Sequence, residues 1–167
     1  MSELITGIIA GVVASVVFYI FLFSVRPRIH VSNKICKESE DGGGAFIRIK
    51  VVNRTRSMLT NVKYVLNYCQ NQGDGRHEID TIPPRKTPLE FIDKYSKRDE
   101  NAEYAVCFSY IIPPNIRISD GWLEFSIHAS HGFSKTSACV KKKYASGDII
   151  PGEFDIGTSM RILPRTP

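Results

Sequence analysis

The sequence has 167 residues, a formal net charge of +5 and 43% hydrophobic residues. This length leaves room for one domain with a hydrophobic core beside a membrane segment. A basic chain binds either nucleic acid or anionic membrane surfaces. We expect no nucleic-acid partner, because the sequence contains no zinc-finger spacing, RNA-recognition motif or basic helix.

Residues 4–25 form an unbroken run without Asp, Glu, Lys or Arg. At 1.5 Å per residue, about 20 apolar residues cross a bilayer core as a helix, so the run predicts one transmembrane helix. A buried core helix is disfavoured because the run has no polar face. A cleaved signal peptide is disfavoured because no Lys or Arg precedes the run and bulky side chains end it. We therefore expect a retained anchor.

The charges beside this helix predict its orientation. Four basic residues follow it, whereas none precedes it, and the positive-inside rule then places the C-terminal side in the cytosol and the N-terminus outside. These residues are Arg26, Arg28, Lys34 and Lys37. Several aromatic residues near the end of the helix are typical of the interfacial belt of a membrane protein.

Small residues recur every four positions in the predicted helix, at Gly7, Gly11 and Ser15. In lipid, such spacing lets two helix backbones approach closely, so these residues form a candidate surface for helix–helix packing and a homo-oligomer. The alternative is that the residues are there only because Gly and Ala are common in membrane helices.

After Arg28, apolar residues recur at every second position, which predicts β-strands. Strands are expected to begin near Ile29 and Ile35 and to continue over residues 46–53, 60–70, 77–82, 89–95, 104–112, 122–130 and 134–144. Residues 38–44 and 71–76 are rich in glycine and polar residues and predict loops. No amphipathic helix separates the strands, so we expect an all-β domain, an antiparallel β-sandwich. The expected divisions are the anchor (1–25), a cytosolic sandwich (26–155) and a C-terminal strand or tail (156–167).

Several short motifs, in this order along the chain, resemble the cytoplasmic immunoglobulin-like (E-set) domain of inward-rectifier potassium channels. They are Arg26-Pro27-Arg28 after the membrane helix, Ile47-Arg48-Ile49-Lys50-Val51-Val52-Asn53, Thr87-Pro88-Leu89, and Tyr144 with Asp148-Ile149, Gly152 and Phe154. The resemblance covers most of residues 26–155 and implies an immunoglobulin-like sandwich. It also suggests fourfold assembly.

The chain departs from those channels in its membrane part. It has one membrane helix, no pore helix and no Thr-x-Gly-Tyr-Gly filter, so the chain alone should not be a potassium-selective channel. The resemblance does imply contact of the basic junction with phosphoinositide headgroups. Candidate headgroup-binding residues are Arg26 and Arg28, with Lys141, Lys142 and Lys143 if their strand faces the membrane. The alternatives are a topology signal for the arginines and a solvated strand edge for the lysines.

Candidates for chemistry are few. His128 and His131 would point to opposite faces of a strand, which disfavours a shared metal. The four cysteines are dispersed without a Cys-x-x-Cys pair, so we expect free thiols. Asn53-Arg54-Thr55 matches a glycosylation sequon, which a cytosolic domain would not use. We expect no metal, no cofactor and no enzyme activity.

The sequence thus predicts a single-pass membrane protein with a non-enzymatic interaction or sensing domain at the inner leaflet. Its partners would be anionic lipid, further copies of the chain and an unidentified protein. The alternative is a membrane effector or channel-like assembly, in which packed anchor helices permeabilise the bilayer. A third hypothesis is a hydrolase or metalloenzyme. If it used a metal, the folded protein would contain bound metal.

Overall fold

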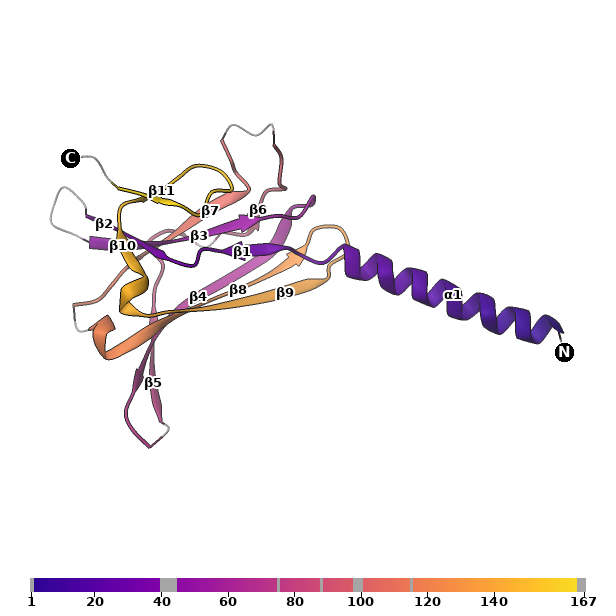
Figure 1. Ribbon diagram of the computed structural model, residues 1–167, viewed down its shortest axis with the longest axis horizontal. Coiled ribbons are helices and arrows are strands. Elements are labelled where there is room, and N and C mark those ends of the chain that lie inside the picture. The colour runs from indigo at the N-terminus through magenta and orange to yellow at the C-terminus, as the bar shows by residue number, and fades with distance from the viewer. Residues whose placement is uncertain are drawn as a thin grey trace.

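The computed structural model describes residues 2–39, 45–74, 76–87, 89–97, 101–114 and 116–164. A single helix, α1 (Ser2–Ser24), projects from a β-rich domain (Figure 1). Over Ser2–Phe21 its mean hydropathy is 2.5 and none of it is buried. Helix α1 is therefore long and apolar enough to cross a membrane, as the sequence predicts.

Five strands form the first sheet. Its order is β1-β3-β2-β10, with β7 paired to the other edge of β3. The strands are β1 (Ile29–Val31), β2 (Ile35–Ser39), β3 (Ala45–Asn53), β7 (Ala105–Ile111) and β10 (Ile149–Pro151). The expectation of a wholly antiparallel sheet was wrong, because β10 runs parallel to β2. A parallel pair needs a long connection, and here the whole second sheet lies between the two strands.

The second sheet has the order β5-β4-β8-β9, with β6 paired to β4. Its strands are β4 (Leu59–Asn71), β5 (His77–Ile82), β6 (Phe91–Ile92), β8 (Gly121–His131) and β9 (Ser137–Tyr144). A small hairpin, β11 (Glu153–Phe154) with β12 (Ile162–Leu163), completes the fold. Two 3-10 turns, η1 (Ile118–Asp120) and η2 (Ser146–Asp148), precede β8 and β10. β5 and the end of β4 extend away from the body of the domain (Figure 1).

Both sheets contribute to one hydrophobic core. Phe108 of the first sheet contacts two aromatic rings of the second, with centroid distances of 4.1 Å to Tyr64 and 5.9 Å to Phe125. The alternating apolar residues predicted for residues 60–70 and 122–130 supply much of this core, including Leu66 and Leu123. Burying these apolar faces supplies the main driving force for folding.

The predicted strand at residues 89–95 shortens to Phe91–Ile92. The backbone beyond it bonds elsewhere: the Asn53 side-chain amide donates to the Asp93 carbonyl at 2.8 Å, and the Tyr95 N–H donates to the Thr55 carbonyl at 3.1 Å. The apolar pattern of a sequence does not show that backbone groups of a segment form hydrogen bonds outside the sheet. The predicted loop at 38–44 has its first two residues in β2, and residues 40–44 lie outside the described residues.

The segment around Tyr144 connects the two sheets. Buried Tyr144 at the end of β9 donates its hydroxyl hydrogen to the Ser32 carbonyl at 2.7 Å. Asp148 then pairs with Lys34 at 2.7 Å, and this contact holds the pKa of that carboxyl below its usual range. These bonds lead the chain into β10 beside β2.

The hairpin of β11 and β12 lies against the first sheet, and it spans the boundary expected at residue 155. Lys50 of β3, which is only 2% exposed, donates to the backbone carbonyls of Asp155 and Ser159. The Cys36 thiol contacts the Gly152 carbonyl at 2.6 Å. Burial lowers the pKa of Lys50, and the two carbonyls supply the hydrogen bonds that a buried ammonium requires.

We predict that Lys50→Met loosens this hairpin, because the two carbonyls lose their donor. Hydrogen bonds to charged groups contribute about 1.5–3 kcal/mol, so the free energy of unfolding should fall by about 1–3 kcal/mol. Amide hydrogen exchange over residues 152–164 should become faster. Lys141→Met is the control, because the Lys141 side chain is 68% exposed and surface pairs contribute little. Unchanged exchange in Lys50→Met would contradict this role.

Candidate anion-binding site at the end of the helix

Residues 25–28 join α1 to β1 and are held tightly by the domain. Pro27 is buried. The Arg28 N–H donates to the Thr55 hydroxyl at 2.7 Å, and the Arg54 N–H donates to the Arg28 carbonyl at 2.8 Å. The connection is therefore packed into the domain, and the helix ends directly against the β domain.

The turn between β8 and β9, residues 131–136, holds the end of the helix from the other side. The hydroxyls of Ser134 and Thr136 donate to the Val25 carbonyl at 3.2 and 3.1 Å. Helix ends leave such carbonyls without partners inside the helix, and here the domain supplies the donors. Figure 1 shows this turn beside the end of α1.

The backbone of the same turn is fixed by its own contacts. The Gly132 N–H donates to the Met58 carbonyl at 2.8 Å, and a Cβ at Gly132 would lie only 2.8 Å from that oxygen. Lys135 has a left-handed conformation with φ of 58°. Buried His131 accepts the Ser134 N–H on Nδ1 at 3.1 Å.

A cavity of about 570 Å³ lies between these segments, and four arginines line it. We call this set, Arg26, Arg28, Arg54 and Arg56, the arginine pocket. The other described lining residues are Val25, Thr55, Ser57, His131 and Phe133, and none of these is acidic. All four arginines are exposed to solvent, so a ligand can reach them.

The electrostatics of the arginine pocket favour an anion. Four arginines line this cavity and none of its other described lining residues is acidic, so the positive charges together attract an anion placed there. Guanidinium groups bind phosphate through paired N–H donors, a geometry that Lys cannot reproduce. The arrangement is therefore suited to a phosphate-bearing ligand.

A second cavity, of about 590 Å³, lies beside β7. Its charged lining residues include both signs, with Arg48 and Lys86 near Asp93 and Glu103. Arg48 also pairs with Glu38 at 2.9 Å. This cavity has no comparable preference for one charge, so the arginine pocket is the stronger candidate.

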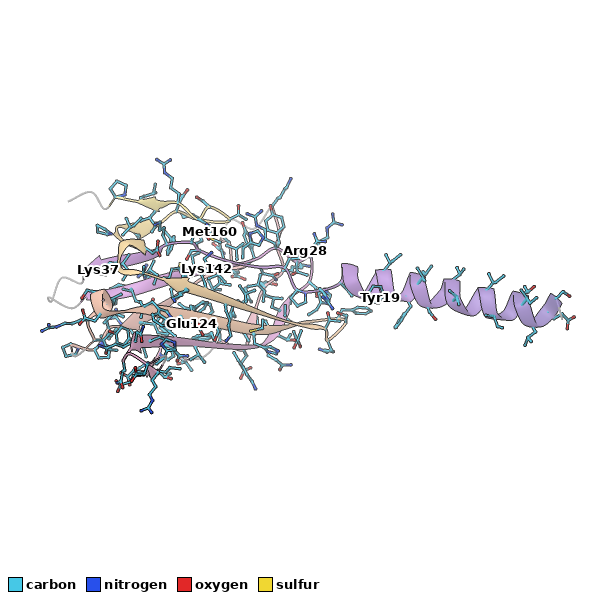
Figure 2. All side chains as sticks on the ribbon, turned by 60° about the horizontal axis from the view of Figure 1, so that its bottom comes forward. Tyr19, Arg28, Lys37, Glu124, Lys142 and Met160 are labelled. Atoms are coloured by element: carbon cyan, nitrogen blue, oxygen red, sulfur yellow. The ribbon has the colours of Figure 1, made fainter. Side chains whose placement is uncertain are left out.

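The predicted headgroup residues divide into two groups. Arg26 and Arg28 lie in the arginine pocket, whereas Lys141, Lys142 and Lys143 are not among its lining residues. Lys142 lies well away from the end of the helix, where Arg28 is found (Figure 2). Each lysine has a local contact: Lys141 with Glu124 at 3.7 Å, Lys142 with Asn33 at 2.7 Å, and Lys143 with the Trp122 ring centroid at 3.6 Å.

Arg54 and Arg56 are site residues that were not predicted from the sequence. They lie in the loop between β3 and β4, and only the fold brings this loop to the end of α1. The sequon asparagine beside them, Asn53, is fully buried. Its side-chain amide donates to the carbonyls of Ser57 and Asp93 at 2.9 and 2.8 Å, so the folded protein does not present it for glycosylation.

On α1, the predicted packing residues lie on an open surface. Gly11 and Ser15 line a shallow groove together with Ile8, Val12, Val16 and Tyr19. A Cβ added at Gly7 or Gly11 would meet nothing within 4 Å. The groove therefore leaves room for the backbone of a second helix.

Candidate metal-binding residues are not gathered in the described part of the chain. It contains no group of three or more His, Cys, Asp or Glu side chains placed to hold a metal. His128 is exposed and His131 is buried. Burial raises the pKa of the Cys36 thiol to about 12, which keeps it protonated and a poor nucleophile at neutral pH.

No protein-family model and no curated protein matches the sequence. The function is therefore inferred from the geometry of the site.

The buried imidazole of His131 predicts a pH dependence of stability. Burial lowers the pKa of His131 in the folded protein, so the unfolded chain binds a proton more readily. The free energy of unfolding should then fall as the pH falls below about 6.5, the ordinary pKa of histidine. His131→Gln should flatten this dependence in unfolding experiments at several pH values. His128→Gln on the exposed face of β8 controls for the loss of an imidazole, and an equal slope in wild type and His131→Gln would contradict the prediction.

Proposed function

We propose that the protein is a single-pass membrane protein whose β domain is a non-enzymatic interaction or sensing module at the inner leaflet, and that the arginine pocket binds anionic lipid headgroups. We also propose that its two sheets form an immunoglobulin-like sandwich. The single observation that carries the proposal is the gathering of four arginines around one cavity at the end of α1.

The length of α1 supports this placement. Its 23 residues extend for about 35 Å at 1.5 Å per residue, slightly more than the roughly 30 Å hydrocarbon core of a bilayer. The junction at residues 25–28 is short and bonded to the domain. The arginine pocket would then lie at the level of the headgroups, where phosphate groups are concentrated.

The direction of insertion follows from charge. Arg26 and Arg28 lie at the domain end of α1, whereas Glu3 is in the first turn of the helix. The positive-inside rule favours the cytosol for the arginine-rich end. Anionic lipids are concentrated in the cytoplasmic leaflet, and each basic residue near its surface contributes about 1 kcal/mol to attraction.

The headgroup proposal predicts weaker lipid binding by the double variant Arg54→Gln/Arg56→Gln. Losing two charges should cost about 2 kcal/mol, or roughly 30-fold in affinity. Binding of dioctanoyl phosphatidylinositol phosphate to the detergent-solubilised full-length protein can be measured by calorimetry. Lys141→Gln/Lys143→Gln removes the same charge outside the pocket and should bind like wild type. Equal loss in the two double variants would show that net charge alone attracts the lipid and would contradict the proposed site.

We further propose that α1 self-associates through Gly7, Gly11 and Ser15. The Ser15 hydroxyl donates to the Gly11 carbonyl at 2.8 Å, and Thr6 bonds Ser2 in the same way at 2.9 Å. Apart from such isolated hydroxyls, α1 carries no stripe of polar side chains of the kind that lines a water-filled pore. This favours close helix packing over the channel-like alternative.

Self-association predicts a defined oligomer in mild detergent that Gly11→Ile converts to monomer, because the isoleucine side chain keeps the backbones apart. Light scattering coupled to size-exclusion chromatography measures the mass. Val13, two residues on and about 200° around the helix, provides the control Val13→Ile, which should leave the oligomer intact. A monomer in wild type would make α1 a simple tether.

A further inference from the structure

An exposed aromatic ring lies beside the arginine pocket and is not explained by anion binding. Phe133, in the turn between β8 and β9, is 76% exposed and lines the same cavity as the four arginines. Burying a phenylalanine side chain contributes about 1.5–3 kcal/mol relative to leaving it in water. A partner that covers this ring would therefore gain free energy.

Backbone hydrogen bonds order the turn that carries Phe133. Besides the bond from Gly132 to Met58, the His131 N–H donates to the Thr136 carbonyl at 2.8 Å, and the Lys135 N–H donates to the His131 carbonyl at 3.0 Å. The ring thus projects from a closed, hydrogen-bonded turn. Because the backbone of the turn is already ordered, covering the ring costs less conformational entropy than ordering a flexible loop would.

The turn that carries Phe133 is also the turn that binds the end of α1, through the Ser134 and Thr136 hydroxyls on Val25. The turn therefore lies at the end of the domain from which α1 emerges (Figure 1). Exposed Lys135 follows it in the turn, and Met58, 39% exposed, is hydrogen-bonded to the turn. An apolar tip flanked by cationic side chains is the composition found at membrane interfaces.

We infer that Phe133 inserts into the interfacial region of the bilayer that holds α1 and forms a second apolar contact of the domain with lipid. The inference rests on the proposed membrane anchoring of α1. Together with the helix and the arginine pocket, the Phe133 contact fixes the rotation and tilt of the domain against the membrane. A helix alone leaves both free, whereas contacts at separate points on the domain do not.

Depth-dependent tryptophan quenching tests the inference in full-length protein reconstituted into liposomes. Trp122 is the only native tryptophan, so Trp122→Phe provides a protein without tryptophan fluorescence. Phe133→Trp in that background places the probe in the turn. Ile79→Trp is the matched control, because Ile79 is 60% exposed on β5, which extends away from the helix (Figure 1). Circular dichroism compares the folding of the two variants.

We expect lipids brominated near the glycerol backbone to quench Phe133→Trp several-fold more strongly than Ile79→Trp. Emission of Phe133→Trp should also shift to shorter wavelength. Adding Arg54→Gln/Arg56→Gln should leave most of this quenching in place, because α1 and the turn still hold the ring at the membrane.

The outcomes separate the inference from the proposal beneath it. Protein that alkaline carbonate extracts from the liposomes would overturn both the anchor and the inference. Protein that resists extraction but shows no quenching of Phe133→Trp would overturn the inference alone. A third outcome is emission that is not quenched and that shifts only as the protein-to-lipid ratio rises. It would assign the Phe133 ring to a contact with a second copy of the chain and would also overturn the inference.

Discussion

The placement of the candidate site depends on one joint, the short junction at residues 25–28 where α1 passes into the β domain. The Val25 carbonyl accepts the hydroxyls of Ser134 and Thr136, while the Arg28 backbone bonds the loop after β3 at Thr55 and Arg54. These bonds bring two loops, far apart in the sequence, to the same end of the helix. The pairing of β1 with β3, with Ile29 opposite Asn53, places the loop that carries Arg54 and Arg56 beside Arg26 and Arg28.

Hydrophobic patterns made much of the fold predictable. The uncharged run predicted α1, and period-two alternation predicted β3, β4 and β8 to within one residue at each end. The pattern failed where other hydrogen bonds replace those between strands. The Asn53 side chain, for example, donates to the Asp93 carbonyl, and β6 ends before this residue. It also missed the parallel β10, because its residues, Ile149-Ile150-Pro151, do not alternate between apolar and polar.

The candidate site shows why basic residues in a sequence are an incomplete guide to a binding surface. Lys141, Lys142 and Lys143 form the most conspicuous run, yet Glu124, Asn33 and the Trp122 ring engage their ammonium groups within the domain. Arg54 and Arg56 are separated by Thr55 and form no run. Thr55 is itself buried and bonds Arg28, so the residue that interrupts the basic pattern is the one that assembles the pocket.

The clustering of four arginines around one cavity has a consequence for stability. The backbone bonds of residues 25–28 and the hydroxyls of Ser134 and Thr136 hold the loops at the end of α1. A ligand that binds only the folded state stabilises it by an amount that grows with ligand concentration. If the pocket binds headgroups as proposed, the stability of the joint depends on the charge of the surrounding leaflet. The orientation of the domain and the lipid composition would then be coupled through the same few bonds at Val25 and Arg28.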